Sequence, residues 1–363
     1  MPVPLKDLVP VVTFVSSFAS PKDPSSPSAF LWFSGGFARA YSESAGAAWR
    51  SPAGLEDFSV RADGFAALLA SLASQYEEVS FEVSASRLVV RSGTFRAQLP
   101  VWPGDVDAPR EWIDRKPPEG GVEVNDAFWS DVARVKAAAS PDEAKPGLCG
   151  VYWAPDGGLI AADNFQAAVC TSPGRAAPRP ALGDPSKPKG VLIPSQVLAL
   201  LGGNPGFDRA AVDEESVWFY SSSGAGSVYG RLYSVEFPAA QFVEFMKVVR
   251  EQAAASTKVE AKGIVNSLER LLFFARRQPY MVKAEVGGDS VRLWVSEEEG
   301  DGRSAEETVP AKVEGGAAAF SVDGKALREI MRNCSSLCTS GARPLYFRSD
   351  DGRFEHVLSL LSS

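Results

Sequence analysis

The chain has 363 residues, a formal net charge of −8, and 45% hydrophobic and 23% charged residues, which is an ordinary globular composition. It contains no apolar run near the roughly 20 residues that span a bilayer, and its first residues lack the basic leader of a secretory signal. One histidine, His356, and four cysteines without a C-x-x-C pair argue against zinc sites and histidine triads. We therefore expect a cytoplasmic protein with reduced thiols, no membrane contact and no metal or cofactor.

A strand that leads into a helix is written three times along the chain, at intervals of about 130 residues. The three phrases are FSVRADGFAALLA at 58–70, VLIPSQVLALL at 191–201 and FSVDGKALREIM at 320–331. In each phrase, Asp-Gly or Pro-Ser separates a short apolar run from an apolar pattern with helical spacing. Similarity at a fixed interval indicates an internal repeat.

Each of the three phrases is preceded by a predicted helix and followed by predicted strands. An amphipathic helix is predicted before each phrase, at 5–15, 127–139 and 264–277. Alternating strand patterns follow the phrases, at 79–101, 211–233 and 344–361. The repeated order of helix, strands, helix and strands predicts an α+β fold of three domains, each with two helices packed on antiparallel sheets. Their expected bounds are 1–103, 104–237 and 238–363.

No catalytic signature is evident in the sequence, so an enzyme is not expected. The sequence contains neither a P-loop nor a G-x-S-x-G motif. Gly224 and Gly226 form a G-x-G pair, but this pair lies inside a hairpin pattern, where glycines serve the turn. The acidic run at 297–302 lacks the alternating oxygen ligands of a calcium loop, so we interpret it as a solvated loop.

Basic residues gather on the predicted helices of the third repeat, although the whole chain is acidic. Basic helices on an acidic protein fit a surface that faces DNA, because Lys and Arg near phosphates give a grip without base recognition. Solvated helix faces are the alternative interpretation. The candidate DNA-facing residues are Arg134, Lys136, Arg270, Arg276, Arg277, Lys325, Arg328 and Arg332.

The predicted helix at 264–277 is too apolar for a single packed face. Its apolar stripe includes Ile264 and Leu268. Phe273 and Phe274 extend beyond that stripe. The wider apolar surface predicts a second contact, such as a joint between subunits, with a broad core stripe as the alternative.

The second repeat carries the most specific pattern, KPGLCGVYWAPDGGLIAADNFQAAVC at 145–170. Its runs 148–151 and 162–168 resemble a strand and a hairpin run in the middle domain of the bacterial DNA polymerase sliding clamps, the β processivity factors. The phrase at 191–201 and the link GRLYSVEFP at 230–238 are similar to the elements that follow in that family. The third repeat matches the family in pattern, and the first 100 residues match it through the repeat alone.

The sequence departs from this family in several places. Phe165 and Gln166 stand where the family has His-Arg, and residues 359–361 read Ser-Leu-Leu instead of Met-Pro-Met. The family's opening strand is missing from the pattern, and Pro10 interrupts the first predicted helix. We therefore expect a rearranged segment at 1–30 and a partner peptide that relies on apolar anchors more than on an acidic group.

The resemblance implies a DNA sliding clamp, a processivity factor that acts in DNA replication as a polymerase accessory protein. Two chains would form a head-to-tail homodimer, a closed ring that encircles duplex DNA without sequence specificity and tethers the replicative polymerase. Phe273 and Phe274 would close the ring against the edge of the first domain, near Phe95. The alternative is a repeat-built scaffold that binds peptides and does not encircle DNA, and retention on circular but not linear DNA would separate the two.

The resemblance also implies a pocket between the second and third domains for short peptides of the polymerase and the clamp loader. Small and apolar walls with a few polar atoms suit such a pocket, although the same residues could instead complete two domain cores. The matching residues are Leu148, Ala162, Asn164, Phe165, Gln166, Ala167, Phe245, Leu358, Ser359 and Leu360.

Overall fold

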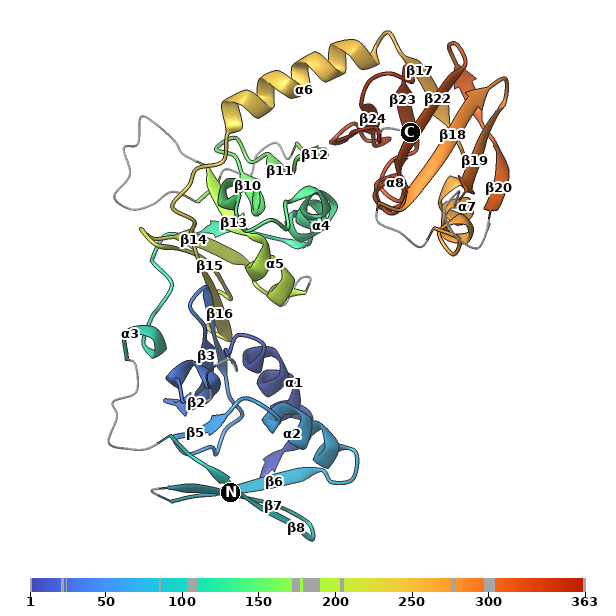
Figure 1. Cartoon of the computed structure of the whole chain (residues 1–363). Coiled ribbons are helices and arrows are strands. Elements are labelled where there is room, and N and C mark those ends of the chain that lie inside the picture. The colour runs from blue at the N-terminus through green and yellow to red at the C-terminus, as the bar shows by residue number, and fades with distance from the viewer. Residues whose placement is uncertain are drawn as a thin grey trace. The chain divides into compact units, whose positions relative to one another are not determined.

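The computed structural model describes residues 2–20, 23, 25–84, 86–102, 110–171, 177–178, 190–202, 206–275, 279–296 and 304–361 (Figure 1). The chain divides into two compact units, Met1–Trp129 with Pro178–Leu232 and Ser130–Ala177 with Tyr233–Ser363. Both units combine helices with antiparallel sheets, so the predicted α+β class is confirmed. Each unit takes stretches from two of the expected domains, and the division at residues 103 and 237 stays a proposal.

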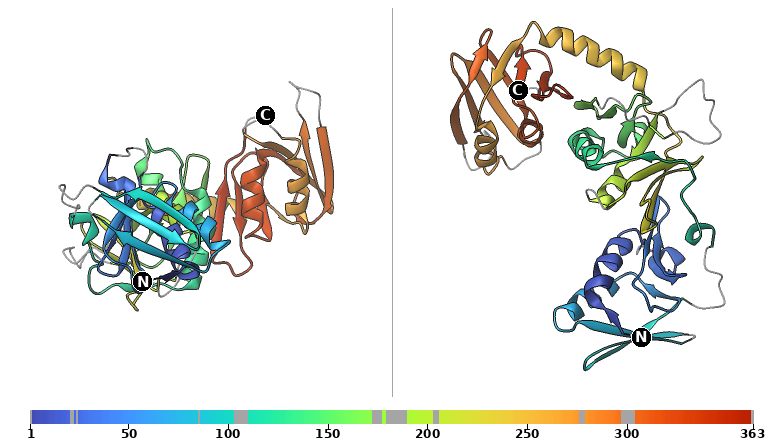
Figure 2. Two further views of the ribbon diagram at one scale, coloured as in Figure 1. Left: turned by 90° about the horizontal axis from the view of Figure 1, so that it is seen from below. Right: turned by 180° about the vertical axis from the view of Figure 1, so that it is seen from behind.

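The first unit contains two antiparallel sheets. The smaller sheet has the order β1-β6-β7-β8, with bounds Val3–Pro4, Glu78–Val83, Arg87–Ser92 and Phe95–Pro100. The larger sheet has the order β5-β2-β3-β4-β16-β15-β14-β9, with bounds Phe58–Arg61, Phe30–Ser34, Phe37–Tyr41, Ala45–Arg50, Gly226–Arg231, Ser216–Tyr220, Arg209–Val212 and Val122–Glu123. Helices α1 (Leu5–Ser16) and α2 (Phe65–Ala73) lie side by side (Figures 1 and 2). This unit also contains the 3-10 turn η1 (Pro27–Ala29), α3 (Arg110–Ile113), β13 (Val191–Pro194), α5 (Ser195–Leu201) and the start of α4 (Asp126–Val135).

The beginning of the chain differs from the expectation based on sequence. The opening strand is present as β1, in which Val3 and Pro4 pair with Val79 and Glu78 of β6, so the prediction that it is missing was wrong. Pro10 lies inside α1 without ending the helix. An interior proline costs about 3 kcal/mol. Helix α1 buries four apolar side chains, each of which contributes about 2 kcal/mol, so burial outweighs the lost backbone hydrogen bond.

Strands β4 and β16 join segments that are far apart in the sequence. They pair antiparallel, with Trp49 opposite Gly226 and Gly46 opposite Tyr229. Each glycine lies under the aromatic ring of its partner, and a Cβ at either position would overlap that ring. Glycine is therefore needed at both positions, because only its bare backbone lets the ladder form beneath the rings.

The guanidinium group of Arg115 packs against a cluster of aromatic rings in the first unit. Its guanidinium carbon lies 4.7 Å from the ring centroid of Tyr229 and 5.4 Å from that of Trp218. Its Nη2 lies 3.2 Å from Oδ2 of Asp213, and the same oxygen accepts a 2.7 Å hydrogen bond from Nε1 of Trp218. A cation over aromatic faces, neutralised by a carboxylate, thus holds the segment after α3 against β15 and β16.

We predict that Arg115→Ala lowers the free energy of unfolding of the whole chain by about 2 kcal/mol, because it removes both the stacked cation and its ion pair. Urea unfolding followed by tryptophan fluorescence measures the change. Arg61→Ala is the control, since Arg61 lies 3.9 Å from Asp63 in an exposed pair and its loss should cost less than about 0.5 kcal/mol. Equal losses in the two variants would contradict the role given to Arg115.

The second unit also contains two antiparallel sheets. One includes the run β10-β11-β12-β25-β24-β23-β17-β21, with bounds Gly150–Trp153, Leu159–Ala162, Gln166–Cys170, Phe354–Leu358, Leu345–Arg348, Ser336–Thr339, Thr257–Glu260 and Lys312–Glu314. The other has the order β20-β19-β18-β22, with bounds Ser304–Pro310, Ser290–Ser296, Met281–Gly287 and Ala318–Asp323. Helices α7 (Ile264–Leu271) and α8 (Gly324–Met331) lie side by side, as α1 and α2 do in the first unit (Figures 1 and 2).

Two helices of this unit differ from the predicted pattern. Helix α6 spans Ala239–Ala253, where the sequence interpretation places only the start of the third domain. It buries Phe242, Met246 and Val249 as one stripe, and its other large apolar side chains, Val243, Phe245 and Val248, stay exposed. Helix α7 ends at Leu271, before the predicted bound at residue 277, so Phe273 lies beyond the helix.

Candidate functional site

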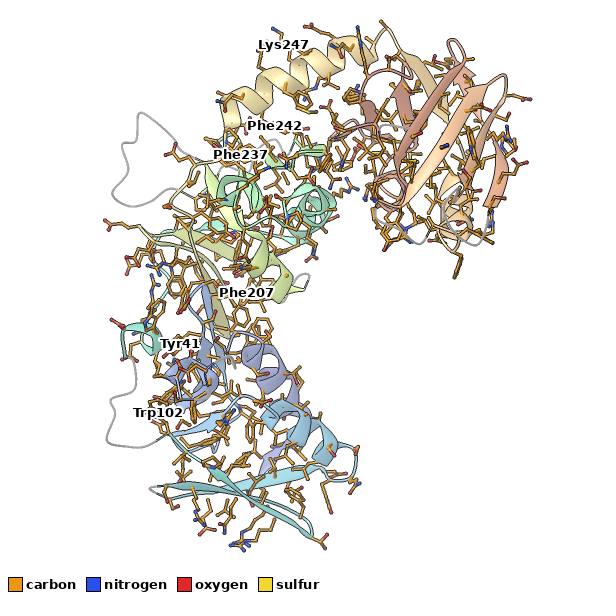
Figure 3. All side chains as sticks on the ribbon, viewed as in Figure 1. Tyr41, Trp102, Phe207, Phe237, Phe242 and Lys247 are labelled. Atoms are coloured by element: carbon orange, nitrogen blue, oxygen red, sulfur yellow. The ribbon has the colours of Figure 1, made fainter. Side chains whose placement is uncertain are left out.

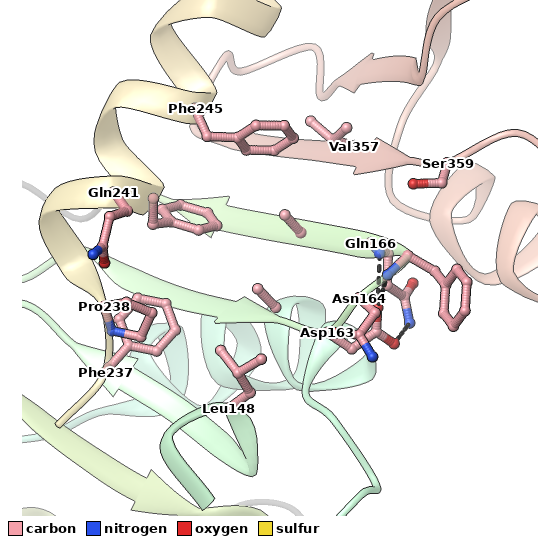
Figure 4. Close-up of a pocket in the computed structure, with 14 residues that line it drawn as sticks. Leu148, Asp163, Asn164, Gln166, Phe237, Pro238, Gln241, Phe245, Val357 and Ser359 are labelled. Carbon is pink, nitrogen blue, oxygen red and sulfur yellow. Dashed lines mark hydrogen bonds between the residues drawn. The ribbon is translucent and has the colours of Figure 1, made fainter. Parts of the chain in front are cut away.

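The second unit contains a pocket of about 310 Å³ that gathers most of the predicted partner-binding residues (Figure 4). Eight of the ten line it, namely Leu148, Ala162, Asn164, Phe165, Gln166, Ala167, Phe245 and Ser359. The hairpin of β11 and β12 supplies one wall, α6 and the turn before it supply another, and the end of β25 supplies a third. Leu148, in the turn before β10, completes the lining, so the pocket depends on four stretches of the chain.

Leu358 and Leu360 are the two predicted residues that do not line this pocket. Side chains alternate between the two faces of a strand, so the register of β25 turns Val357 and Ser359 toward the pocket and Leu358 away from it. Leu358 is buried, and Leu360 is half-buried just after the strand. The alternative role that the sequence left open, completion of a core, describes Leu358 better.

Of the lining residues that the structure describes, sequence reasoning missed six, namely Asp163, Phe237, Pro238, Gln241, Phe242 and Val357. Most of them belong to α6 or to the turn before it. The spacing of Phe242, Met246 and Val249 is helical, and it is the signal that could have revealed this wall. Phe237 is buried against Tyr152, whose ring centroid lies 4.9 Å away, and this stacking fixes where α6 begins.

A tight turn sets the polar side of the pocket (Figure 4). Oδ1 of Asp163 accepts hydrogen bonds from the backbone N–H groups of Phe165 at 2.6 Å and Gln166 at 2.7 Å. The side-chain amide of Gln166 donates to the carbonyl oxygen of Ala137 at 3.0 Å, and its Oε1 lies 3.3 Å from Nε2 of His356. Gln166 is therefore fixed, whereas the ring of Phe165 is 63% exposed at the rim.

The pocket is nearly neutral. Among the described residues that line it, Asp163 is the only one with a formal charge, and none is basic. Its carboxylate is occupied by the turn that it caps. Apolar contact therefore dominates what this pocket can offer a ligand, and an acidic ligand group would meet no cation among the described side chains of the lining.

His356 supports the pocket from within the sheet. It is buried on β25, and burial lowers the pKa of its imidazole to about 3 because the charged form loses its hydration. The ring is therefore neutral at pH 7, with Nε2 placed to donate to Oε1 of Gln166.

This burial predicts a specific dependence of stability on pH. The unfolded imidazole titrates near 6.5, so the unfolded chain binds a proton in a range where the folded chain does not. The free energy of unfolding should therefore fall as the pH drops from about 6.5 toward 3, and by pH 4.5 His356 should account for about 3 kcal/mol of that loss. His356→Gln should flatten this part of the profile in urea titrations at each pH. Parallel profiles for the two proteins would contradict the assignment.

Most of the predicted DNA-facing arginines are paired with carboxylates of the same unit. Arg270 forms an ion pair with Glu307, which lies on β20. Arg332 lies 2.7 Å from Glu269 and 2.9 Å from Glu329. These pairs reduce the positive field of α7 and α8 that the sequence suggested.

The other predicted basic residues have varied surroundings. Arg328 lies 2.7 Å from Glu329, and Arg134 lies 3.8 Å from Asp351. The ammonium group of Lys325 lies 3.5 Å from the ring centroid of Tyr280, and Lys136 is exposed. Arg276 and Arg277 lie outside the described residues. No group of side chains in the described part of the chain has the composition of a metal site.

The predicted subunit-contact residues lie at exposed places. Phe273 is 80% exposed and Phe274 is 37% exposed, both just after the end of α7. Phe95 is half-buried on β8, which is an edge strand of its sheet. None of the helices that the structure describes is both long and apolar enough to cross a membrane.

The fold matches solved structures of known proteins over the whole chain. The β subunit of DNA polymerase III from Thermotoga maritima is 18% identical, with a TM-score of 0.78, and the match covers 100% of this chain and 99% of that one. The β subunit from Borrelia burgdorferi, solved with a natural product, is 11% identical with a TM-score of 0.79 and coverages of 100% and 98%. The sliding clamp from Pseudomonas aeruginosa bound to griselimycin is 12% identical with a TM-score of 0.77 and coverages of 100% and 99%.

These likenesses define the class of fold. No protein-family model matches the chain, and no curated protein matches it by sequence. The structural matches nevertheless agree in fold and extend from end to end. The chain has the fold of the bacterial DNA polymerase III β sliding clamps, and its sequence is between 11% and 18% identical to those of these three solved examples.

Proposed function

We propose that the chain is a DNA sliding clamp that acts in the cytoplasm. Two copies close head to tail into a ring that encircles duplex DNA without sequence specificity and tethers a replicative polymerase. The observation that carries this proposal is the end-to-end match of the fold to sliding clamps. The pocket on the second unit adds support, because a clamp needs a place where peptides of the polymerase and the clamp loader can bind.

Ring closure is supported by exposed edges and exposed rings. Strand β8 is a free edge of one sheet and β20 is a free edge of another, among the described strands. An unpaired edge is a template for a strand of another chain, and head-to-tail pairing of β8 with β20 would satisfy both edges. Phe273 and Phe274 would then lie against the region of Phe95 and be removed from water.

The grip on DNA is proposed to be weak and limited to phosphates. Among the described residues, Lys136 and Lys325 have no carboxylate within 4.0 Å, so they are the most available of the candidate cations. The paired arginines can contribute only by exchanging their carboxylate partners for phosphate. A weak grip without base contacts is compatible with sliding.

The same pairing of charges favours a second candidate function, a peptide-binding scaffold that does not encircle DNA. A peptide-binding scaffold of this fold would not need cationic helices, and the ion pairs of Arg270 and Arg332 leave α7 and α8 with little excess charge. The two functions differ in topology, because only a closed ring is held on DNA that has no ends.

We predict that the full-length chain, closed around nicked circular plasmid, stays bound at a salt concentration that abolishes ionic binding and is released when the plasmid is linearised. Phe273→Ala combined with Phe274→Ala should give a folded monomer by mass photometry and no retention, because the apolar contact is lost. Phe165→Ala removes another exposed ring and should keep both the dimer and the retention. Equal retention on circular and linear DNA would contradict the ring, and a double variant of wild-type mass would contradict the interface.

Binding of partner peptides in the pocket can be tested separately from ring closure. Leu148→Asp places a charge in an apolar wall and should weaken partner peptides roughly 30-fold or more, and so abolish polymerase stimulation. The ring should stay intact, which retention on circular DNA would report. Leu360→Asp is the matched control, since Leu360 is half-buried like Leu148 but does not line the pocket. The pocket assignment fails if both variants stimulate the polymerase as the wild type does.

A further inference from the structure

Helix α6 separates the pocket from a second hollow on the same unit. This hollow, which we call the α6 groove, has a volume of about 670 Å³ and lies between α6 and the strands β10, β11 and β12. Phe242 lines both the pocket and the α6 groove. It is buried, whereas Lys247 on the same helix is exposed (Figure 3). The helix is thus a ridge with a hollow along each flank.

The floor of the α6 groove is an apolar row that crosses three strands. Tyr152 lies opposite Ile160, and Ile160 lies opposite Val169 in the antiparallel ladder, so the three side chains share one face of the sheet. Met246 and Val243 supply the wall on α6. Val243 is 59% exposed, which leaves a large apolar side chain in water beside an apolar floor.

The rim of the α6 groove is acidic. Asp156 lies in the turn between β10 and β11, and Glu244 lies on α6. Neither has a basic side chain within 4.0 Å among the described residues. Arg250 is the only basic side chain among the described residues that line the groove, and its Nε lies 2.7 Å from Oε2 of Glu355, so its charge is already balanced.

We propose that the α6 groove binds an extended peptide segment of a partner protein. One or two apolar side chains of the peptide lie on the row of Tyr152, Ile160 and Val169, and a lysine or arginine next to them lies at Asp156 and Glu244. The charge of the rim selects a basic segment over an acidic one. This inference goes beyond the clamp function, since it needs neither a ring nor DNA.

Two fluorescein-labelled peptides of ten residues test the proposal on the full-length chain by fluorescence anisotropy. Both have the same framework of Leu, Phe and Gly, and they differ only in carrying two Lys or two Glu. The lysine peptide should bind at least about tenfold more tightly than the glutamate peptide. Asp156→Asn combined with Glu244→Gln should reduce this preference to about twofold or less.

A matched pair of substitutions on α6 locates the binding. Val243→Gln should weaken the lysine peptide at least about fivefold, because it removes the exposed apolar wall. Val248→Gln changes the same residue type on the same helix, at a side chain that is 41% exposed and lines neither hollow, and should change the affinity less than about twofold.

Four results would overturn the proposal. Equal affinity for the two peptides would remove the selection by charge, and equal effects of the two valine substitutions would indicate non-specific adhesion. Loss of lysine-peptide binding in Leu148→Asp but not in Val243→Gln would place the peptide in the pocket instead. A change of oligomeric mass in Val243→Gln with unchanged peptide affinity would mean that a second copy of the chain covers the groove.

Discussion

The antiparallel pairing of β12 with β25 is the contact on which the candidate site depends. It joins residues 166–170 to residues 354–358 and places Gln166 opposite Leu358. The hydrogen bonds of this ladder satisfy the backbone of both strands and carry the β11–β12 hairpin to the end of β25. The pocket walls from Ala162 and Ser359 lie together only because this register is kept. The contact of His356 with Gln166 then fixes the polar side of the same wall.

Helix α6 lies on one face of the sheet and separates two hollows there, the pocket and the α6 groove. Its buried stripe packs on the sheet, and the side chains on either flank of that stripe, Phe245 and Val243, border the pocket and the α6 groove. A helix places neighbouring residues about 100° apart, so a single stripe necessarily has two flanks. Apolar side chains on both flanks of the stripe are exposed to water, although they do not take part in packing the helix on the sheet.

The charge pattern of the second unit constrains how such a protein could hold DNA. The arginines of α7 and α8 face carboxylates within the same unit, and exposed pairs of this kind contribute little to stability. These ion pairs lower the positive electrostatic field around the two helices, so that few cations remain available to phosphates. A ring that holds DNA by topology needs only such a weak field, whereas an open binding surface would need a stronger one.

The sequence by itself determined the elements that local signals encode. Each phrase of the repeat forms a strand followed by a helix, and Asp323 accepts hydrogen bonds from the N–H groups of Lys325 and Ala326 at the predicted start of α8. The resemblance to sliding clamps pointed to eight residues that the fold gathers in one pocket. Only the tertiary structure decided that Leu358 faces away from the pocket, that α6 supplies a wall, and that Arg270 meets Glu307. These features depend on strand register and on contacts between distant segments, which no local pattern of residues encodes.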